Sequence, residues 1–178
     1  MKMNNKITCI ALFENEDLNK IENIVSILDD KLCKVPLFIE DREKVDTLPY
    51  HTTLSVWDIE QQNKVTEVFK NINMQKIELE VSEVKVKKGY FTGDESWNLY
   101  LAINENSKLR EIQDYIYQNL PNEKYNPETF IIHITLHCDS DYEKLNLMKE
   151  KLMRNFIPFK IKFNKLGLFV IYPVKKVL

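Results

Sequence analysis

The 178-residue sequence predicts a single α+β domain, and three observations carry this prediction. Apolar residues make up 44% of the chain and only 3 residues are glycine, which is typical of a globular protein rather than a disordered one. Alternating, strand-like segments are interleaved with segments whose apolar residues recur every three or four positions, as in helices. A chain with only 3 histidines also contains His-x-Thr-Leu twice, which indicates an internal repeat.

In the first half of the chain, the apolar segment 6–13 reads as a buried strand, and a short strand is expected at 35–40. Residues 51–57 alternate and are rich in β-branched side chains, which favours another strand. Asp58, with Gln61 three residues later, has the pattern of a helix capping box. The two helices expected here carry apolar faces formed by Leu18, Ile21, Ile24, Val25, Leu28 and Leu32, and by Val65, Val68, Phe69 and Ile72.

The second half begins with the alternating segment 76–91, which predicts a long strand. Turn residues at 93–96 lead to a returning strand at 97–103. A third helix is expected from 107 to 120 and a further strand from 130 to 138.

After that strand, Ser140 and Glu143 form a second capping-box pattern ahead of a fourth helix. The rest of the chain reads as two strands with a turn near Asn164 or Gly167. One unit, a His-x-Thr-Leu strand followed by a capped helix, thus occurs twice, and nothing in the composition divides the chain into independent domains.

Charge and composition exclude several classes of protein. A net charge of −2 and a pI of about 6.0 argue against a protein that grips long duplex nucleic acid through many phosphates. No apolar run approaches the roughly 20 residues of a membrane helix, and the first residues do not resemble a signal peptide. Cys9, Cys33 and Cys138 are far apart and form no CxxC pair, so we expect buried thiols and a cytoplasmic protein.

The repeated motif places a polar surface on each of its two strands. His51 and His133 lie 82 positions apart (133 − 51). Alternate side chains of a strand share a face. In the first strand this places polar residues and one tryptophan on the same face, and in the second strand it places polar residues alone on the same face. The two predicted groups are His51, Thr53, Ser55 and Trp57, and His133, Thr135 and His137.

Two such strands fit general acid–base chemistry. An imidazole exchanges a proton near neutral pH, and two imidazoles across a cleft can take a proton from an attacking water and give one to a leaving oxygen. Each threonine lies about 6–7 Å along its strand from the motif histidine, and it can donate a hydrogen bond to a phosphoryl oxygen. This chemistry needs no metal ion and no cofactor.

The paired His-x-Thr motif, with about eighty residues between its copies, resembles that of the 2H phosphoesterase superfamily. The segments "KITCIALF", "SEVKVKKGYFTGDESWNLYLAI" and "FNKLGLFVIYPVKKVL" extend the likeness to small bacterial proteins of the 2′-5′ RNA ligase family. The resemblance implies one bilobal domain over residues 1–178, in which two antiparallel sheets with outer helices are related by a pseudo-two-fold around an active cleft. The family has an apolar residue where this chain has Thr52, so we expect the first strand to be less deeply covered.

The same resemblance implies an activity and its residues. His51 and His133 would be the acid–base pair, and Thr53 and Thr135 would hold the phosphate. The implied substrates are RNA or nucleotide ends that carry a 2′,3′-cyclic phosphate or a 2′-5′ linkage, and we expect a monomer. The sequence leaves open which histidine is the acid.

Other residues are weaker candidates for substrate contact. Tyr90 and Phe91, beside a glycine at the end of a long strand, are the aromatic residues most suited to stack on a nucleobase. His137 is expected at the rim of the site, because it lies too far along the strand from His133 for both to bind one zinc ion. Lysines of the chain, Lys85 and Lys87 among them, read mostly as solvated, with one or two helping to attract a phosphate.

Two other functions remain compatible with the motif. A binding module could hold a nucleotide or RNA end in the same cleft without turnover. A structural protein with two polar strand faces would instead place His51 and His133 far apart.

Overall fold

The computed structural model describes residues 6–28, 50–91, 94–171 and 175–177. The strands are β1 (Lys6–Phe13), β2 (His51–Asp58), β3 (Ile77–Phe91), β4 (Asp94–Ile103), β5 (His133–Asp139), β6 (Phe159–Ile171) and β7 (Lys175–Lys176). The helices are α1 (Asn15–Val25), α2 (Gln62–Lys70), α3 (Ser107–Asn119) and α4 (Tyr142–Met153), with short 3₁₀ turns η1 (Ile59–Gln61) and η2 (Glu123–Tyr125). The strand expected at 35–40, Leu32 and Cys33 lie outside the described residues.

The described strands form one antiparallel sheet in the order β1-β2-β5-β4-β3-β6-β7. Because β1 also pairs with β6, the six long strands close into a ring. The ring is joined only narrowly between β2 and β5, where the single pair is Thr52 with Ile134. The predicted α+β class is confirmed, and the two sheets expected from the resemblance are continuous with each other through β2–β5 and β3–β6.

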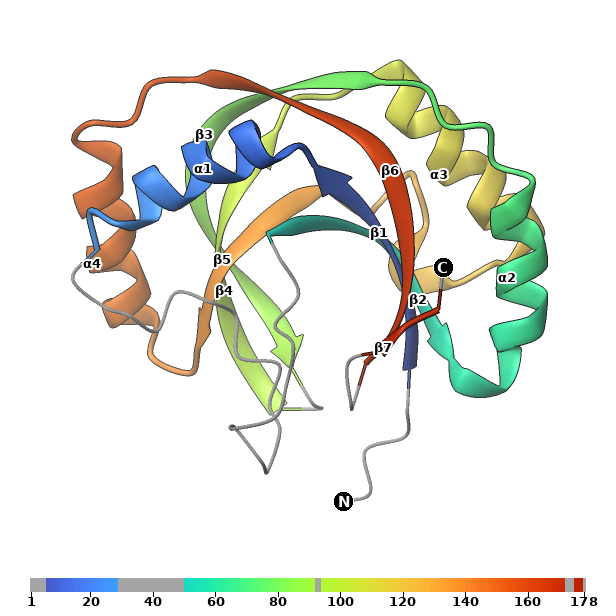
Figure 1. Ribbon diagram of the computed structural model, residues 1–178. Coiled ribbons are helices and arrows are strands. Elements are labelled where there is room, and N and C mark those ends of the chain that lie inside the picture. Colours follow the sequence, from blue (N-terminus) through green and yellow to red (C-terminus); the bar gives the residue numbers. More distant parts are fainter. Residues whose placement is uncertain (1–5, 29–49, 92–93, 172–174, 178) are drawn as a thin grey trace.

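Two halves of the chain repeat the same order of elements. The first half is β1-α1-β2-α2-β3 and the second is β4-α3-β5-α4-β6. In the sheet, β2 lies beside β5 and β3 beside β6, so a pseudo-two-fold axis passes between the members of each pair. Helices α1 and α4 lie on one side of the molecule and α2 and α3 on the other, outside the strands (Figure 1). Each side therefore carries one helix from each half of the chain.

The core lies between the strands and these helices. We call the sheet face that packs against the helices the outer face, and the opposite one the inner face. The core includes residues of the outer face from strands of both halves, namely Ile7, Leu54, Leu79, Leu99, Leu101, Ile134, Leu136 and Phe163. Among the described residues, no helix is long and apolar enough to cross a membrane.

Three local predictions are wrong. The last segment does form two strands, but β6 runs through Asn164 and Gly167 without a turn, and only its pairing with β1 is irregular at Asn164. Asp58 makes no capping hydrogen bond, because its carboxylate pairs with Lys6 of the neighbouring strand. Helix α4 is capped by Asp141, which accepts from the amide of Lys144 at 3.1 Å, and not by Ser140.

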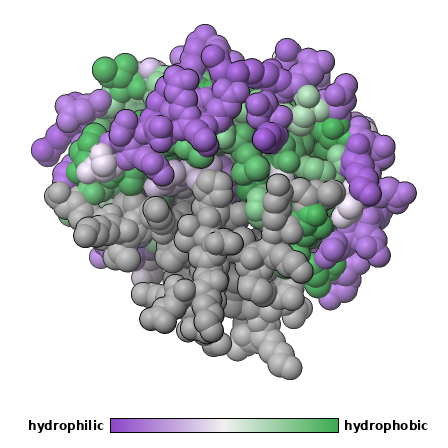
Figure 2. All heavy atoms as spheres, viewed as in Figure 1, coloured by the Kyte–Doolittle hydropathy of each residue, from purple (hydrophilic) through white to green (hydrophobic). Residues whose placement is uncertain are grey.

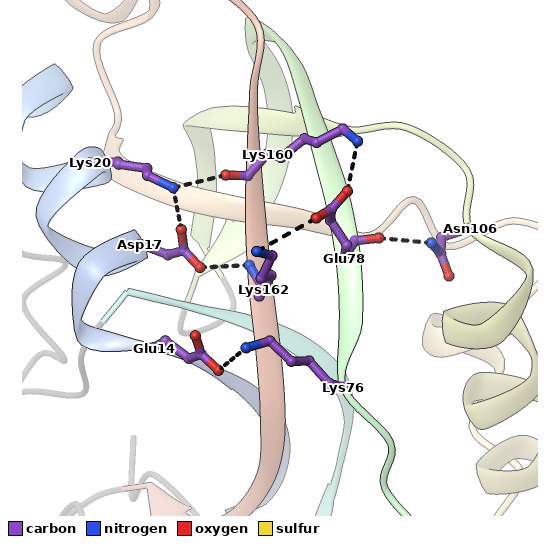
Figure 3. Close-up of polar contacts among 8 residues, drawn as sticks. All are labelled: Glu14, Asp17, Lys20, Lys76, Glu78, Asn106, Lys160 and Lys162. Carbon is purple, nitrogen blue, oxygen red and sulfur yellow. Dashed lines mark hydrogen bonds and ion pairs between the residues drawn. The ribbon is translucent and has the colours of Figure 1, made fainter.

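A network of charged residues ties α1 to the strands where β3 and β6 meet (Figure 3). Asp17 is only 4% exposed, and its carboxylate accepts from Lys20 Nζ at 2.6 Å and from the Lys162 amide at 2.7 Å. Glu78 of β3 pairs with Lys160 of β6 at 2.7 Å. In the orientation of Figure 1, hydrophilic side chains cover much of the upper part of the molecule (Figure 2). The network thus joins α1 to β6 and β6 to β3 through side chains outside the hydrophobic core.

Replacement of Asp17 by alanine tests this connection. The variant leaves the Lys162 amide without its buried acceptor, so the free energy of unfolding should fall by about 1–3 kcal/mol. Urea denaturation measures the change. Glu16→Ala, on the exposed side of the same helix turn, is the control, and an equal effect of both variants would contradict a specific role for Asp17.

Candidate active site

The narrow β2–β5 junction brings the two motifs together on the inner face. Thr52 and Ile134, the second residues of the motifs, pair directly and antiparallel. Continued by one residue in each direction, this register sets His51 opposite Thr135 and Thr53 opposite His133. Facing side chains on one face of such a pair lie about 5 Å apart and diagonal ones about 7–8 Å apart. The four motif residues thus form one group, and all four are half-buried.

The same bulge follows both motifs. In β2 the pairing with β1 passes from Thr53–Ile10 to Ser55–Cys9, which leaves Leu54 as an extra residue. In β5 the pairing with β4 passes from Thr135–Tyr100 to His137–Leu99, which leaves Leu136 as an extra residue. A bulge puts two consecutive residues on one face. Each strand therefore has its His and Thr on the inner face. The leucine that follows and the residue after it, Ser55 or His137, both lie on the outer face.

These bulges overturn part of the predicted surface. Ser55, Trp57 and His137 do not share a face with the motif histidines, because each follows the extra residue. Trp57 is 4% exposed, and its indole Nε1 donates to the carbonyl of Leu120 at 3.2 Å. His137 is also 4% exposed and pairs with the core residue Leu99, so its predicted place at the rim is wrong.

Thr52 has an environment different from the expected one. It is fully buried, and its hydroxyl donates to the His133 carbonyl across the junction at 3.5 Å. The first strand is therefore not less covered than the second. An apolar residue at this position would need no hydrogen-bond partner. The buried Thr52 hydroxyl has its partner in this long hydrogen bond to the opposite motif.

His133 is held by its own backbone and by aromatic rings. Its Nδ1 lies 2.8 Å from the carbonyl oxygen of Ile131. The rings of Tyr100 and Phe130 lie 5.1 and 5.9 Å from the imidazole, centroid to centroid. Burial, the positive charge of Lys87 and that of His51 together lower the pKa of His133 from 6.5 to about 4, and the hydrogen bond to the Ile131 carbonyl opposes them only in part. At neutral pH this imidazole is unprotonated.

Lys87 is a charged group close to this histidine. It comes from β3, and its Nζ lies 3.3 Å from His133 Nδ1. The ammonium also lies 5.1 Å from the centre of the Tyr100 ring and 5.8 Å from that of Phe130. Burial lowers the pKa of Lys87, since its ammonium is partly removed from water. The sequence places it in a run of lysines, which is why it reads there as a solvated residue.

The inner face is polar around strands β3, β4 and β5 and mostly apolar around strands β1, β2 and β6. Beside Thr135, the register brings Tyr100 and Lys85 together, and then Asn98 and Lys87. Beside Thr53, the equivalent strands bring Ile10 and Gly167 together, and then Thr8 and Phe169. The backbone symmetry of the two halves is therefore not matched by the side chains around their motifs.

The remaining candidates have separate outcomes. Tyr90 and Phe91 lie in β3, but their side chains are outside the described part of the structure. Burial raises the pKa of the Cys138 thiol to about 11, and Cys9 is buried in the core. Within the described ranges no group of three or more His, Cys, Asp or Glu side chains could hold a metal ion.

Comparison with known proteins supports the fold. No family model and no curated protein sequence matches the chain. Among solved structures, the LigT protein of E. coli complexed with ATP has a TM-score of 0.56 at 12% identity, over 93% of this chain and 87% of that one. Usb1 of Kluyveromyces marxianus with uridine monophosphate has a TM-score of 0.56 at 11% identity, over 98% and 97%.

A third crystal structure, described as a phosphoesterase, has a TM-score of 0.55 at 12% identity, over 94% of this chain and 88% of that one. The chain therefore has the fold of the 2H phosphoesterases, as the sequence predicts. These likenesses extend over nearly the whole length of each chain. At this level of identity they establish the fold and leave the activity to the site.

The buried state of His133 predicts how stability depends on pH. Its pKa is about 4 in the folded protein, against an ordinary 6.5, so between these values the unfolded chain binds a proton that the folded one does not. This histidine therefore makes the free energy of unfolding rise with pH over this window, and its contribution is lost as pH falls. Urea denaturation from pH 4 to 7 should show a flatter dependence for His133→Gln than for the wild type, and parallel curves would contradict the assignment.

Proposed function

We propose that the protein is a phosphoesterase that acts on RNA or nucleotide ends by general acid–base catalysis with two histidines. The observation that carries the proposal is the grouping of His51, Thr53, His133 and Thr135 across the β2–β5 junction. Strand alternation directs these residues to the inner face, and a bulge at an equivalent place in each strand turns Ser55 and His137 to the outer face. A protein whose motifs served only to build strands would not need both pairs on one surface.

The reaction that suits this group is the opening of a 2′,3′-cyclic phosphate, or the reversible making and breaking of a 2′-5′ linkage. In hydrolysis, one histidine takes a proton from water as the water oxygen bonds to phosphorus. The bond from phosphorus to the 2′ or 3′ oxygen breaks, and the other histidine gives that oxygen a proton. The hydroxyls of Thr53 and Thr135 donate to the non-bridging oxygens, whose negative charge grows in the transition state. These steps need no metal ion.

The neighbouring structures agree with a nucleotide-sized ligand. LigT has been crystallised with ATP and with 3′-AMP, and Usb1 with uridine monophosphate. Their common feature is a phosphate on a nucleoside. We infer that this chain takes a ligand of the same chemical class in the group formed by its four motif residues.

Substitution of the motif residues tests the proposal. His51→Ala and His133→Ala should each lower kcat by about 10²- to 10⁴-fold, because each removes one proton transfer. Thr53→Val and Thr135→Val should lower it by about 10²- to 10³-fold, as for loss of one donor to an oxyanion. Thr66→Val on helix α2 is the matched control and should leave kcat unchanged. Turnover is measured on a panel of 2′,3′-cyclic nucleotides and 2′-5′-linked dinucleotides.

The pH dependence, the metal dependence and the product of the reaction provide a second test. The pH profile of the wild type should be bell-shaped, and activity should persist in a chelator. Identification of the product as a 2′- or 3′-phosphate determines which bond is cleaved. Activity that survives both histidine substitutions on every substrate would rule out the proposal. Binding of nucleoside monophosphates without any turnover would favour a binding module instead.

A further inference from the structure

The pseudo-symmetry of the site is broken at one partly buried charge. Lys87 of β3 and Phe169 of β6 occupy equivalent places, since they pair with Asn98 and Thr8 in the equivalent strands β4 and β1. Strands β3, β4 and β5, which surround His133, therefore have an ammonium on their inner face where strands β6, β1 and β2, which surround His51, have a phenyl ring. A symmetric pair of histidines could exchange roles, but a pair with one lysine cannot do so freely.

We propose that Lys87 is a further residue of the site, which binds a non-bridging oxygen of the phosphate and keeps His133 in the unprotonated state of a general base. This inference rests on the proposed function and deepens it. It assigns His133 to the water and His51 to the leaving oxygen in the hydrolytic direction. It also adds a cation to a site in which the motifs supply only neutral hydroxyls.

The contacts of Lys87 support a role in anion binding. Among the described residues, its neighbours are His133, Tyr100 and Phe130, and no carboxylate pairs with it. By contrast, Lys85, two residues earlier on the same face, pairs with Glu83 at 2.5 Å. A partly buried ammonium is costly unless a negative charge compensates it. A bound phosphodiester carries one negative charge and would supply that compensation.

The hydrogen bonding of His133 indicates which nitrogen acts. The Ile131 carbonyl oxygen, 2.8 Å from Nδ1, can only accept, so Nδ1 carries the proton of the neutral ring. The lone pair then resides on Nε2, which is the nitrogen available to take a proton from water. Lys87 cannot donate to a protonated Nδ1, and its N–H groups are thereby left for an anion.

The charges that face His133 all disfavour its protonated form. Lys87 faces it from β3, His51 from β2, and Tyr100 packs against it from β4 as a neutral phenol. Burial raises the pKa of Tyr100, which keeps that phenol neutral. None of these groups is a carboxylate that would stabilise an imidazolium. His133 therefore begins the reaction with its acceptor nitrogen free of a proton.

Binding of inorganic phosphate and titration of His133 test the proposal without reliance on turnover. Lys87→Met should weaken phosphate binding by about 10- to 100-fold in calorimetry, as for loss of a charge-assisted hydrogen bond. In NMR titrations of the imidazole, the pKa of His133 should move up from about 4 toward 6.5, although burial keeps it below that value. Lys87→Arg retains the charge and should keep the pKa low.

Lys85→Met is the matched control, because it removes the same charge from the same face of the same strand. It should change phosphate affinity by less than about threefold, as expected for an exposed paired lysine. A Lys87→Met protein that is folded by circular dichroism, but binds phosphate and titrates like the wild type, would overturn the proposal. If the wild type shows no turnover, the proposed function fails, yet these two measurements still decide whether Lys87 binds phosphate beside His133.

Discussion

The pairing of Thr52 with Ile134 is the constraint on which the rest of the site depends. It is the only residue pair that joins β2 to β5 in the described sheet, and it lies at the centre of both motifs. Because side chains alternate, a shift of this pairing by one residue would put the two histidines on opposite faces of the sheet. The Thr52 hydroxyl, which donates to the carbonyl of His133, adds a polar contact at the same point. The second residue of each motif thus sets the position of the first and third.

Much of this fold can be predicted from the sequence because its signals are local. The 3.6-residue period of apolar positions predicts α3 from 107 to 120, and the structure has it from Ser107 to Asn119. The alternation over 76–91 predicts β3 equally well. Ring closure is less accessible, since the contact of β1 with β6 depends on residues far apart in the chain. The predicted turn in β6 failed for a related reason, because pairing with β1 and β3 holds that strand extended through Asn164.

The candidate site shows where strand alternation stops being a guide. His51 and Thr53, like His133 and Thr135, stand at alternate positions before any irregularity, so a period of two places them correctly. Beyond Leu54 and Leu136 the period breaks, and Ser55 and His137 pass into the core. No residue type in "HTTLS" or "HITLH" marks a bulge. Lys87 was equally hard to single out, because its burial depends on two aromatic residues from other segments, Tyr100 and Phe130.

The closure of the ring also has a consequence for how the chain folds. Strand β1 needs partners from β2 and from β6, and Ile10 pairs with Gly167, near the opposite end of the chain. At a synthesis rate of about 5–20 residues per second, one edge of β1 stays unpaired for on the order of 10 seconds or more, until β6 has been synthesised. Contacts between such distant residues are formed slowly, and an open strand edge can pair with another chain meanwhile. A nascent copy of this protein is therefore most exposed to misassembly just before its last long strand leaves the ribosome.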